Sequence, residues 1–176
     1  MTRLDVREKA ERIVELFRGR QPIEILPADL YPENLDEAYA IRRVFQEIEE
    51  KKGRGAIAGY RIGLTTPVMQ KLCGVGEPCR GAIFARELYH RRAELAAAEY
   101  CHLGVETEIA FRLSADLPQG GAPGEIVGAV ESCMAAIELI EDLHYDYKRR
   151  DDYKRLDPAA MVAGNVWNAG VVLARR

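Results

Sequence analysis

Apolar and polar residues alternate along the segment from Val105 to Leu113, a pattern that few structures other than a β-strand accommodate. Successive side chains of a strand point to opposite faces. One face carries Val105, Thr107, Ile109, Phe111 and Leu113, and the other carries Glu106, Glu108, Ala110 and Arg112. Residues two apart on a strand lie about 6.6 Å apart along it, so Glu106 and Glu108 can converge on one ion or one cationic side chain. A solvated polar face explains the alternation equally well.

A third acidic residue, Glu138, lies inside the otherwise apolar run Met134 to Ile140. An unpaired ionised glutamate there would cost several kcal/mol unless it were neutralised, paired or bound to a metal. Three carboxylates form an oxygen-only donor set of the kind that suits Mg²⁺ or Mn²⁺. The alternative is that Glu138 pairs with an arginine or a lysine. The sequence alone leaves both interpretations open.

Residues 1–53 have the periodicity of helices. Thr2 followed by Asp5 resembles a capping box, and the first helix is expected to end at Gly19. Asn34 is a good N-cap for a second amphipathic helix that ends near Gly53. The inward positions of that second helix are Ala38, Ile41, Val44, Phe45 and Ile48. We therefore expect an N-terminal helical region over residues 1–53.

From Arg54 the pattern changes to strands and turns, which predicts an α+β fold with a β-rich core over residues 54–176. Strands are expected over residues 56–64, 82–85 and 171–173. Short helices are expected after Thr65-Thr66-Pro67, over residues 125–133, and after Asp157-Pro158. The chain stops on Arg175-Arg176 directly after a strand, so we expect an incomplete sheet that self-associates or pairs with a chain that completes it.

Composition excludes several classes of protein. Hydrophobic residues make up 48% of the chain, which is enough for a core and excludes disorder over most of it. The net charge is −3, and the basic cluster from Lys148 to Arg150 adjoins aspartates, so nucleic acid is not an expected partner. No apolar run is long enough to cross a bilayer, so no membrane association is expected. The four cysteines form no Cys-x-x-Cys pair, and reduced thiols in the cytoplasm are expected.

Several short motifs follow one another in a recognisable order. They are Gly59-Tyr60-Arg61-Ile62-Gly63-Leu64-Thr65, Gly74-Val75-Gly76-Glu77-Pro78, Gly81-Ala82-Ile83-Phe84, Glu106-Thr107-Glu108-Ile109-Ala110, Ala136-Ile137-Glu138-Leu139, Ala163-Gly164-Asn165 and Gly170-Val171-Val172-Leu173. In this order the chain resembles the 2-keto-4-pentenoate hydratase and 2-oxo-3-hexenedioate decarboxylase group of the fumarylacetoacetate hydrolase superfamily. The N-terminal part, including Gln21-Pro22-Ile23, contributes to the resemblance.

The resemblance implies a mixed-sheet, barrel-like catalytic core behind a helical N-terminal region. It also implies a divalent metal, Mg²⁺ or Mn²⁺, held at the positions of Glu106, Glu108 and Glu138. The implied substrates are 2-oxo or 2-hydroxydienoic acids from aromatic ring-cleavage pathways, chelated through the C1 carboxylate and the C2 oxygen. Lewis-acid stabilisation of an enolate would then allow water to add or carbon dioxide to leave.

Three positions depart from the pattern of the group. Arg61 stands where its hydratases usually have lysine, and a permanently charged guanidinium can bind a carboxylate but is a poor proton shuttle. Cys79 follows Pro78 where an aspartate can occur, and Gly164 replaces the aspartate of Ala-Asp-Asn. At the positions that match the motifs of the group, the expected site residues are Arg61 and Cys79 for catalysis. Those expected for substrate binding are Arg61, Leu64, Thr65 and Asn165.

The resulting hypothesis is a metal-dependent hydro-lyase that adds water to a 2-hydroxydienoate or 2-oxo-alkenoate. A 2-oxo acid decarboxylase or a carbon-carbon hydrolase of the same superfamily is the first alternative, because the metal ligands are shared. A non-catalytic, truncated subunit is the second alternative, since it accounts for the three departures and the unpaired last strand.

Overall fold

The computed structural model describes residues 4–19, 26–117, 119–141 and 157–175. Its helices are α1 (Val6–Arg18), α2 (Leu35–Glu49), α3 (Pro67–Cys73), α4 (Pro123–Gly128) and α5 (Pro158–Ala163). Its strands are β1 (Ile57–Gly63), β2 (Cys79–Phe84), β3 (Leu88–His90), β4 (Leu103–Leu113), β5 (Val130–Glu141) and β6 (Asn168–Leu173). The predicted α+β fold class is confirmed. The loop expected over residues 145–155 and the motif Gln21-Pro22-Ile23 lie outside the described residues.

Local capping explains where the helices begin. Asn34 Oδ1 accepts from the Glu37 N–H at 2.9 Å, which confirms the predicted start of α2. Thr66 and Asp157 cap α3 and α5, each with proline at the first helical positions. The first helix differs from the prediction because its capping box pairs Asp5 with Glu8, not Thr2 with Asp5. Each side chain of that pair accepts from the other residue's backbone N–H at 2.8 Å.

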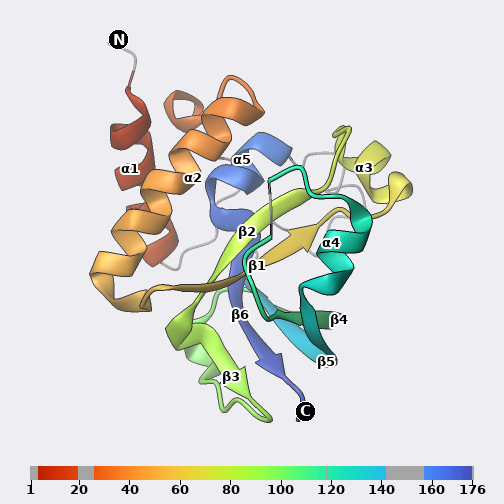
Figure 1. Ribbon diagram of the computed structural model, residues 1–176. Coiled ribbons are helices and arrows are strands. Elements are labelled where there is room, and N and C mark those ends of the chain that lie inside the picture. Colours follow the sequence, from red (N-terminus) through yellow and green to blue (C-terminus); the bar gives the residue numbers. More distant parts are fainter. Residues whose placement is uncertain (1–3, 20–25, 118, 142–156, 176) are drawn as a thin grey trace.

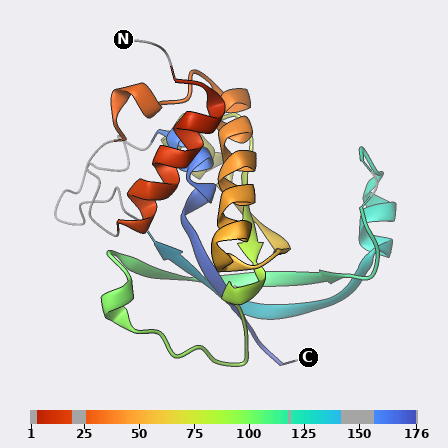
Figure 2. The same ribbon diagram turned by 90° about the vertical axis from the view of Figure 1, so that its left-hand side faces the viewer.

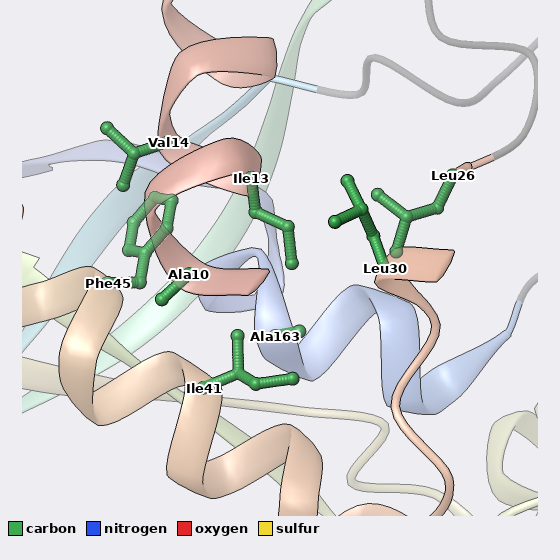
Figure 3. Packing of buried hydrophobic residues seen from close by; sticks show 8 residues of the cluster. All are labelled: Ala10, Ile13, Val14, Leu26, Leu30, Ile41, Phe45 and Ala163. Carbon is green, nitrogen blue, oxygen red and sulfur yellow. The ribbon is translucent and has the colours of Figure 1, made fainter. Parts of the chain in front are cut away.

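The helices share one core with the C-terminal part of the chain. Helices α1 and α2 lie side by side, and α5 packs against them (Figure 1). The core cluster is Ala10, Ile13, Val14, Leu26, Leu30, Ile41, Phe45 and Ala163 (Figure 3). The rings of Phe17 and Phe45 meet edge to face with centroids 5.9 Å apart. Helix α5 therefore joins the helical layer although it belongs to the predicted region 54–176, and the boundary near residue 53 stays a prediction.

The strands form two open sheets. Strands β1 and β2 pair antiparallel, and the second sheet has the order β3-β6-β5-β4. Within it β3 and β6 are parallel while the other neighbours are antiparallel, so the sheet is mixed as predicted. Strands β4 and β5 form a long ribbon that extends away from the helices, with α4 at its far end (Figure 2). Among the described residues, no helix combines the length and apolar character needed to cross a membrane.

The helix predicted over residues 125–133 is wrong in its second half. Helix α4 ends at Gly128, and β5 begins at Val130, directly opposite Leu113. The pairing of β5 with the full length of β4 is a long-range contact that outweighs local helix propensity. Strand β3 was not predicted, because it forms by parallel pairing with β6, which is a long-range contact.

One face of the β4–β5 ribbon leaves apolar side chains uncovered. Val105, Ile109 and Phe111 on β4 are all more than 60% exposed, and Ile137 on β5 is 45% exposed. Strand β4 is also the edge of its sheet. The alternation in this segment thus predicts the strand and its two faces, while both faces are solvent-exposed along most of β4.

Candidate functional site

The antiparallel register of β4 and β5 brings the three predicted carboxylates together. Glu106 lies directly opposite Glu138, and Glu108 lies opposite the small residue Ala136. One carboxylate oxygen of each glutamate lies within 4.8 Å of the oxygens of the other two. Like charges directly opposite each other on paired strands are destabilising. The cluster therefore requires a positive partner.

Arg61, on β1, supplies part of that positive charge. Its Nε lies 2.8 Å from Glu138 Oε1, and its Nη2 lies 3.7 Å from Glu106 Oε2. The Nε–H is not aligned for a hydrogen bond, so the contact with Glu138 is an ion pair. Glu138 therefore pairs with an arginine, which is one of the two interpretations that the sequence leaves open. Glu138 also lies with the other two carboxylates, and metal binding by the three stays a prediction.

Glu138 is the buried member of the cluster, with 3% of its surface exposed, whereas Glu106 and Glu108 are exposed. Burial raises its pKa, an effect that Arg61 and a hydrogen bond from Asn168 oppose and that the charges of Glu106 and Glu108 increase. Asn168 Nδ2 donates to Glu138 Oε1 at 3.0 Å. Within the described part of the chain no group donates to Oε2, so that oxygen remains for a ligand.

The donor set fits a hard divalent cation. Three carboxylates offer oxygen atoms only, and two of them are exposed, where a cation can enter, while the third is buried. Arg61 contributes one positive charge against three carboxylates, which leaves the cluster negative. A cation at this place would therefore offset charge that the described residues do not neutralise.

The predicted catalytic residue Cys79 lies next to this site but inside the protein. Its side chain is 1% exposed and packs in a cluster with Ala38, Met161, Val162 and Val166. Burial raises the pKa of the Cys79 thiol, and only the charges of Arg42 and Arg61 oppose that effect. Its environment favours the neutral thiol over the nucleophilic thiolate.

The three residues that are predicted to bind substrate together with Arg61 have different surroundings. Leu64 is partly buried against the Cys79 cluster and has a positive φ of 55°, while Thr65 is exposed. Asn165 is 1% exposed, and its amide is used within the protein. Its Oδ1 accepts from Gln46 Nε2 at 2.9 Å and from the Ala82 N–H at 2.8 Å, and its Nδ2 donates to the Ala82 carbonyl at 2.9 Å.

A left-handed turn that the sequence did not reveal connects these elements. Asn165, Val166 and Trp167 have φ values of 60°, 55° and 57°, which is unusual for three consecutive residues other than glycine. Arg61 Nη1 donates to the Val166 carbonyl at 2.6 Å and so links the turn to the carboxylates. Such strained segments persist only where the surroundings hold them, and they are frequent at functional sites.

Fold and site together define an α+β protein whose mixed sheet carries three clustered carboxylates of the kind that hold a hard cation. Comparison with known proteins shows what this chain is similar to. The chain is 32% identical over 172 residues to 2-keto-4-pentenoate hydratase of Paraburkholderia phymatum, which covers 97% of this chain and 63% of that protein. It is 28% identical over 171 residues to 2-oxo-hept-4-ene-1,7-dioate hydratase of Escherichia coli, covering 95% and 62%. Over nearly its whole length the chain is thus similar to these hydratases, in agreement with the resemblance that its motifs predict.

A solved structure gives the same result for the fold. The 4-oxalocrotonate decarboxylase of Pseudomonas putida G7, complexed with magnesium and adipate, superposes with a TM-score of 0.84 at 23% identity, covering 100% of this chain and 64% of the decarboxylase chain. No family model matches the sequence. The chain spans just under two thirds of the length of the curated relatives it matches first.

Proposed function

We propose that this protein is a cation-dependent hydro-lyase that adds water to a 2-hydroxydienoate or 2-oxo-alkenoate, as its relatives named 2-keto-4-pentenoate hydratase do. The observation that carries the proposal is the convergence of Glu106, Glu108 and Glu138 on one point. Two decarboxylase structures of similar fold are complexed with magnesium and adipate, and with calcium and acetate, which supports a divalent cation beside a carboxylate ligand.

In this proposal Glu106, Glu108 and Glu138 hold Mg²⁺ or Mn²⁺. The bound cation supplies Lewis-acid stabilisation of negative charge on a 2-oxo acid. Arg61 favours the ionised form of Glu138, and the guanidinium hydrogens that are not directed to Val166 can orient the C1 carboxylate of the substrate. Because an arginine stays protonated, its role is to bind and orient.

The remaining site residues have proposed roles that differ in kind. Leu64 and Thr65, directly after β1, are the candidates for direct contact with the substrate. Asn165 acts by holding the left-handed turn, because its amide already bonds to Gln46 and Ala82. A catalytic role for Cys79 stays a prediction, and the burial of its thiol argues against a thiolate.

The proposed activity is tested directly with the purified chain. With Mg²⁺ or Mn²⁺ it should hydrate 2-hydroxypenta-2,4-dienoate, seen as loss of the ultraviolet absorbance of the conjugated diene, and a chelator should abolish turnover. Glu108→Ala should abolish it as well, since a ligand charge is lost. Release of carbon dioxide from 2-oxo-3-hexenedioate in place of hydration would favour the decarboxylase alternative. Cation binding with no turnover of either acid would favour the non-catalytic subunit.

The affinity for the cation should depend on pH through Glu138. Burial raises the pKa of this carboxyl, so a proton competes with the cation at a higher pH than for an exposed glutamate. Affinity should rise as pH rises through that raised pKa and fall below it. The cation-free protein should show the opposite trend, because a raised folded pKa contributes stability at low pH that is lost as pH rises through it. Calorimetric titration with Mg²⁺ across about pH 5 to pH 8 tests this, and a constant affinity would contradict it.

The proposal also covers the association of this protein with other chains, its partners and its location in the cell. The β4 edge and the uncovered apolar face of the β4–β5 ribbon favour self-association, or association with a chain that completes the sheet. Small 2-oxo acids are the proposed substrates, with no role for nucleic acid or membranes. A cytoplasmic location is proposed from the cysteine pattern.

A further inference from the structure

The buried carboxylate Glu138 is held from the side by Asn168, the first residue of β6. Asn168 is 5% exposed, and its side-chain hydrogen bond goes from Nδ2 to Glu138 Oε1 at 3.0 Å. The ion pair with Arg61 uses the same oxygen. Both contacts therefore involve Oε1 of Glu138, and neither involves Oε2.

An irregularity in the sheet is what gives Asn168 this position. Along β5 and β6, Glu138 pairs with Val171 and Leu139 with Gly170, but Ile140 pairs with Asn168, so Ala169 is an extra residue on β6. In an unbroken ladder Ile140 would face Ala169, and Asn168 would point to the opposite face of the sheet. The bulge turns the Asn168 side chain to the face that carries Glu138. Gly170, directly after the extra residue, has a φ of 145°, a conformation that glycine adopts readily.

The amide oxygen of Asn168 indicates that the hydrogen bond to Glu138 does not serve stability alone. Its Oδ1 is buried and accepts no hydrogen bond within the described part of the chain. Reversing the amide would not help, because Oδ1 would then face Glu138 Oε1, and two acceptors repel each other. A buried acceptor without a partner is unfavourable. The Asn168 side chain therefore keeps the hydrogen bond from Nδ2 to Glu138, while its Oδ1 has no donor among the described residues.

The geometry points to Asn168 as a positioning residue, which fixes the Glu138 carboxylate through Oε1 so that Oε2 is presented to the cation. This inference rests on the cation site proposed above. Arg61 Nε, although close, is not aligned for a hydrogen bond, so Asn168 is the group that sets the rotation of the carboxylate. Partners of this kind, which orient a ligand without touching the ion, typically change metal affinity 10- to 100-fold when removed.

The test compares Asn168→Leu, which keeps the approximate shape but has no donor, with wild type in calorimetric titrations with Mn²⁺. The dissociation constant should rise about 10- to 100-fold with the stoichiometry unchanged. Asn34→Leu is the matched control, because it also removes one asparagine hydrogen bond, at the start of α2. It should lower the melting temperature and leave the affinity for Mn²⁺ unchanged. Equal affinities of wild type and Asn168→Leu would overturn the inference, whereas a wild type that binds no Mn²⁺ would overturn the cation site itself.

A second measurement needs no substitution at Asn168. In wild-type protein labelled with ¹⁵N-asparagine, the side-chain amide signal of Asn168 should shift as Mg²⁺ is added, in proportion to saturation of the site. The signal of Asn34 should stay in place. If the Asn168 signal does not move when calorimetry shows the site to be saturated, Asn168 has no positioning role.

Discussion

Glu138→Gln should abolish the stabilisation that a divalent cation gives to this protein. A ligand that binds only the folded state stabilises it by about 2.7 kcal/mol at 100 times its dissociation constant. For a chain of this length that corresponds to a rise of about 5–10 °C in melting temperature. Glutamine keeps the shape of the side chain but removes the charge that offsets Arg61, so the guanidinium then repels the incoming cation. Melting curves with and without Mn²⁺ should coincide for this variant.

The matched control is Glu131→Gln, an exposed position on the same strand as Glu138. Its melting temperature should rise with Mn²⁺ as the wild type does. A cation-dependent rise of several degrees in Glu138→Gln would show that the stabilising cation binds elsewhere.

Asn165→Ala should lower the free energy of unfolding by about 3–5 kcal/mol, the largest effect on stability that we expect. The substitution leaves Gln46 Nε2 and both backbone groups of Ala82 buried without their partner. It also places alanine at a φ of 60°, where asparagine is better tolerated. Urea unfolding should show a lower midpoint with an unchanged slope.

Asn165→Gly separates the two causes of that loss. Glycine adopts the left-handed conformation without strain, so it should recover about 1 kcal/mol relative to alanine while the hydrogen bonds stay lost. An alanine variant within about 1 kcal/mol of wild type would mean that the network around Asn165 contributes little to stability.

Features with a local cause could be predicted from the sequence. The starts of α2, α3 and α5 each depend on one capping side chain and, in two cases, a neighbouring proline, so a few residues suffice to locate them. The grouping of Glu106 with Glu108 follows from strand alternation. Glu138 was a candidate because a carboxylate in an apolar run needs a partner. The order of the motifs indicates a resemblance to these hydratases, and the similar relatives agree with it.

Features with a long-range cause could not be predicted. The direct pairing of Glu106 with Glu138 depends on the register of two strands separated by a loop and a helix. The contacts of Arg61 join β1 to β5 and to the turn at Val166. Asn168 reaches Glu138 only because of a bulge, and no periodicity in a single sequence marks an extra residue. The one available signal was a polar residue at the start of an apolar strand.

Diffraction from crystals soaked in Mn²⁺, recorded for its anomalous signal, tests the central claim most directly. We predict one anomalous peak that lies within about 2.2 Å of a carboxylate oxygen from each of Glu106, Glu108 and Glu138, with Asn168 still bonded to Glu138. The account would be contradicted if saturating Mn²⁺ produced no peak among these three side chains while the Arg61 guanidinium remained against Glu138.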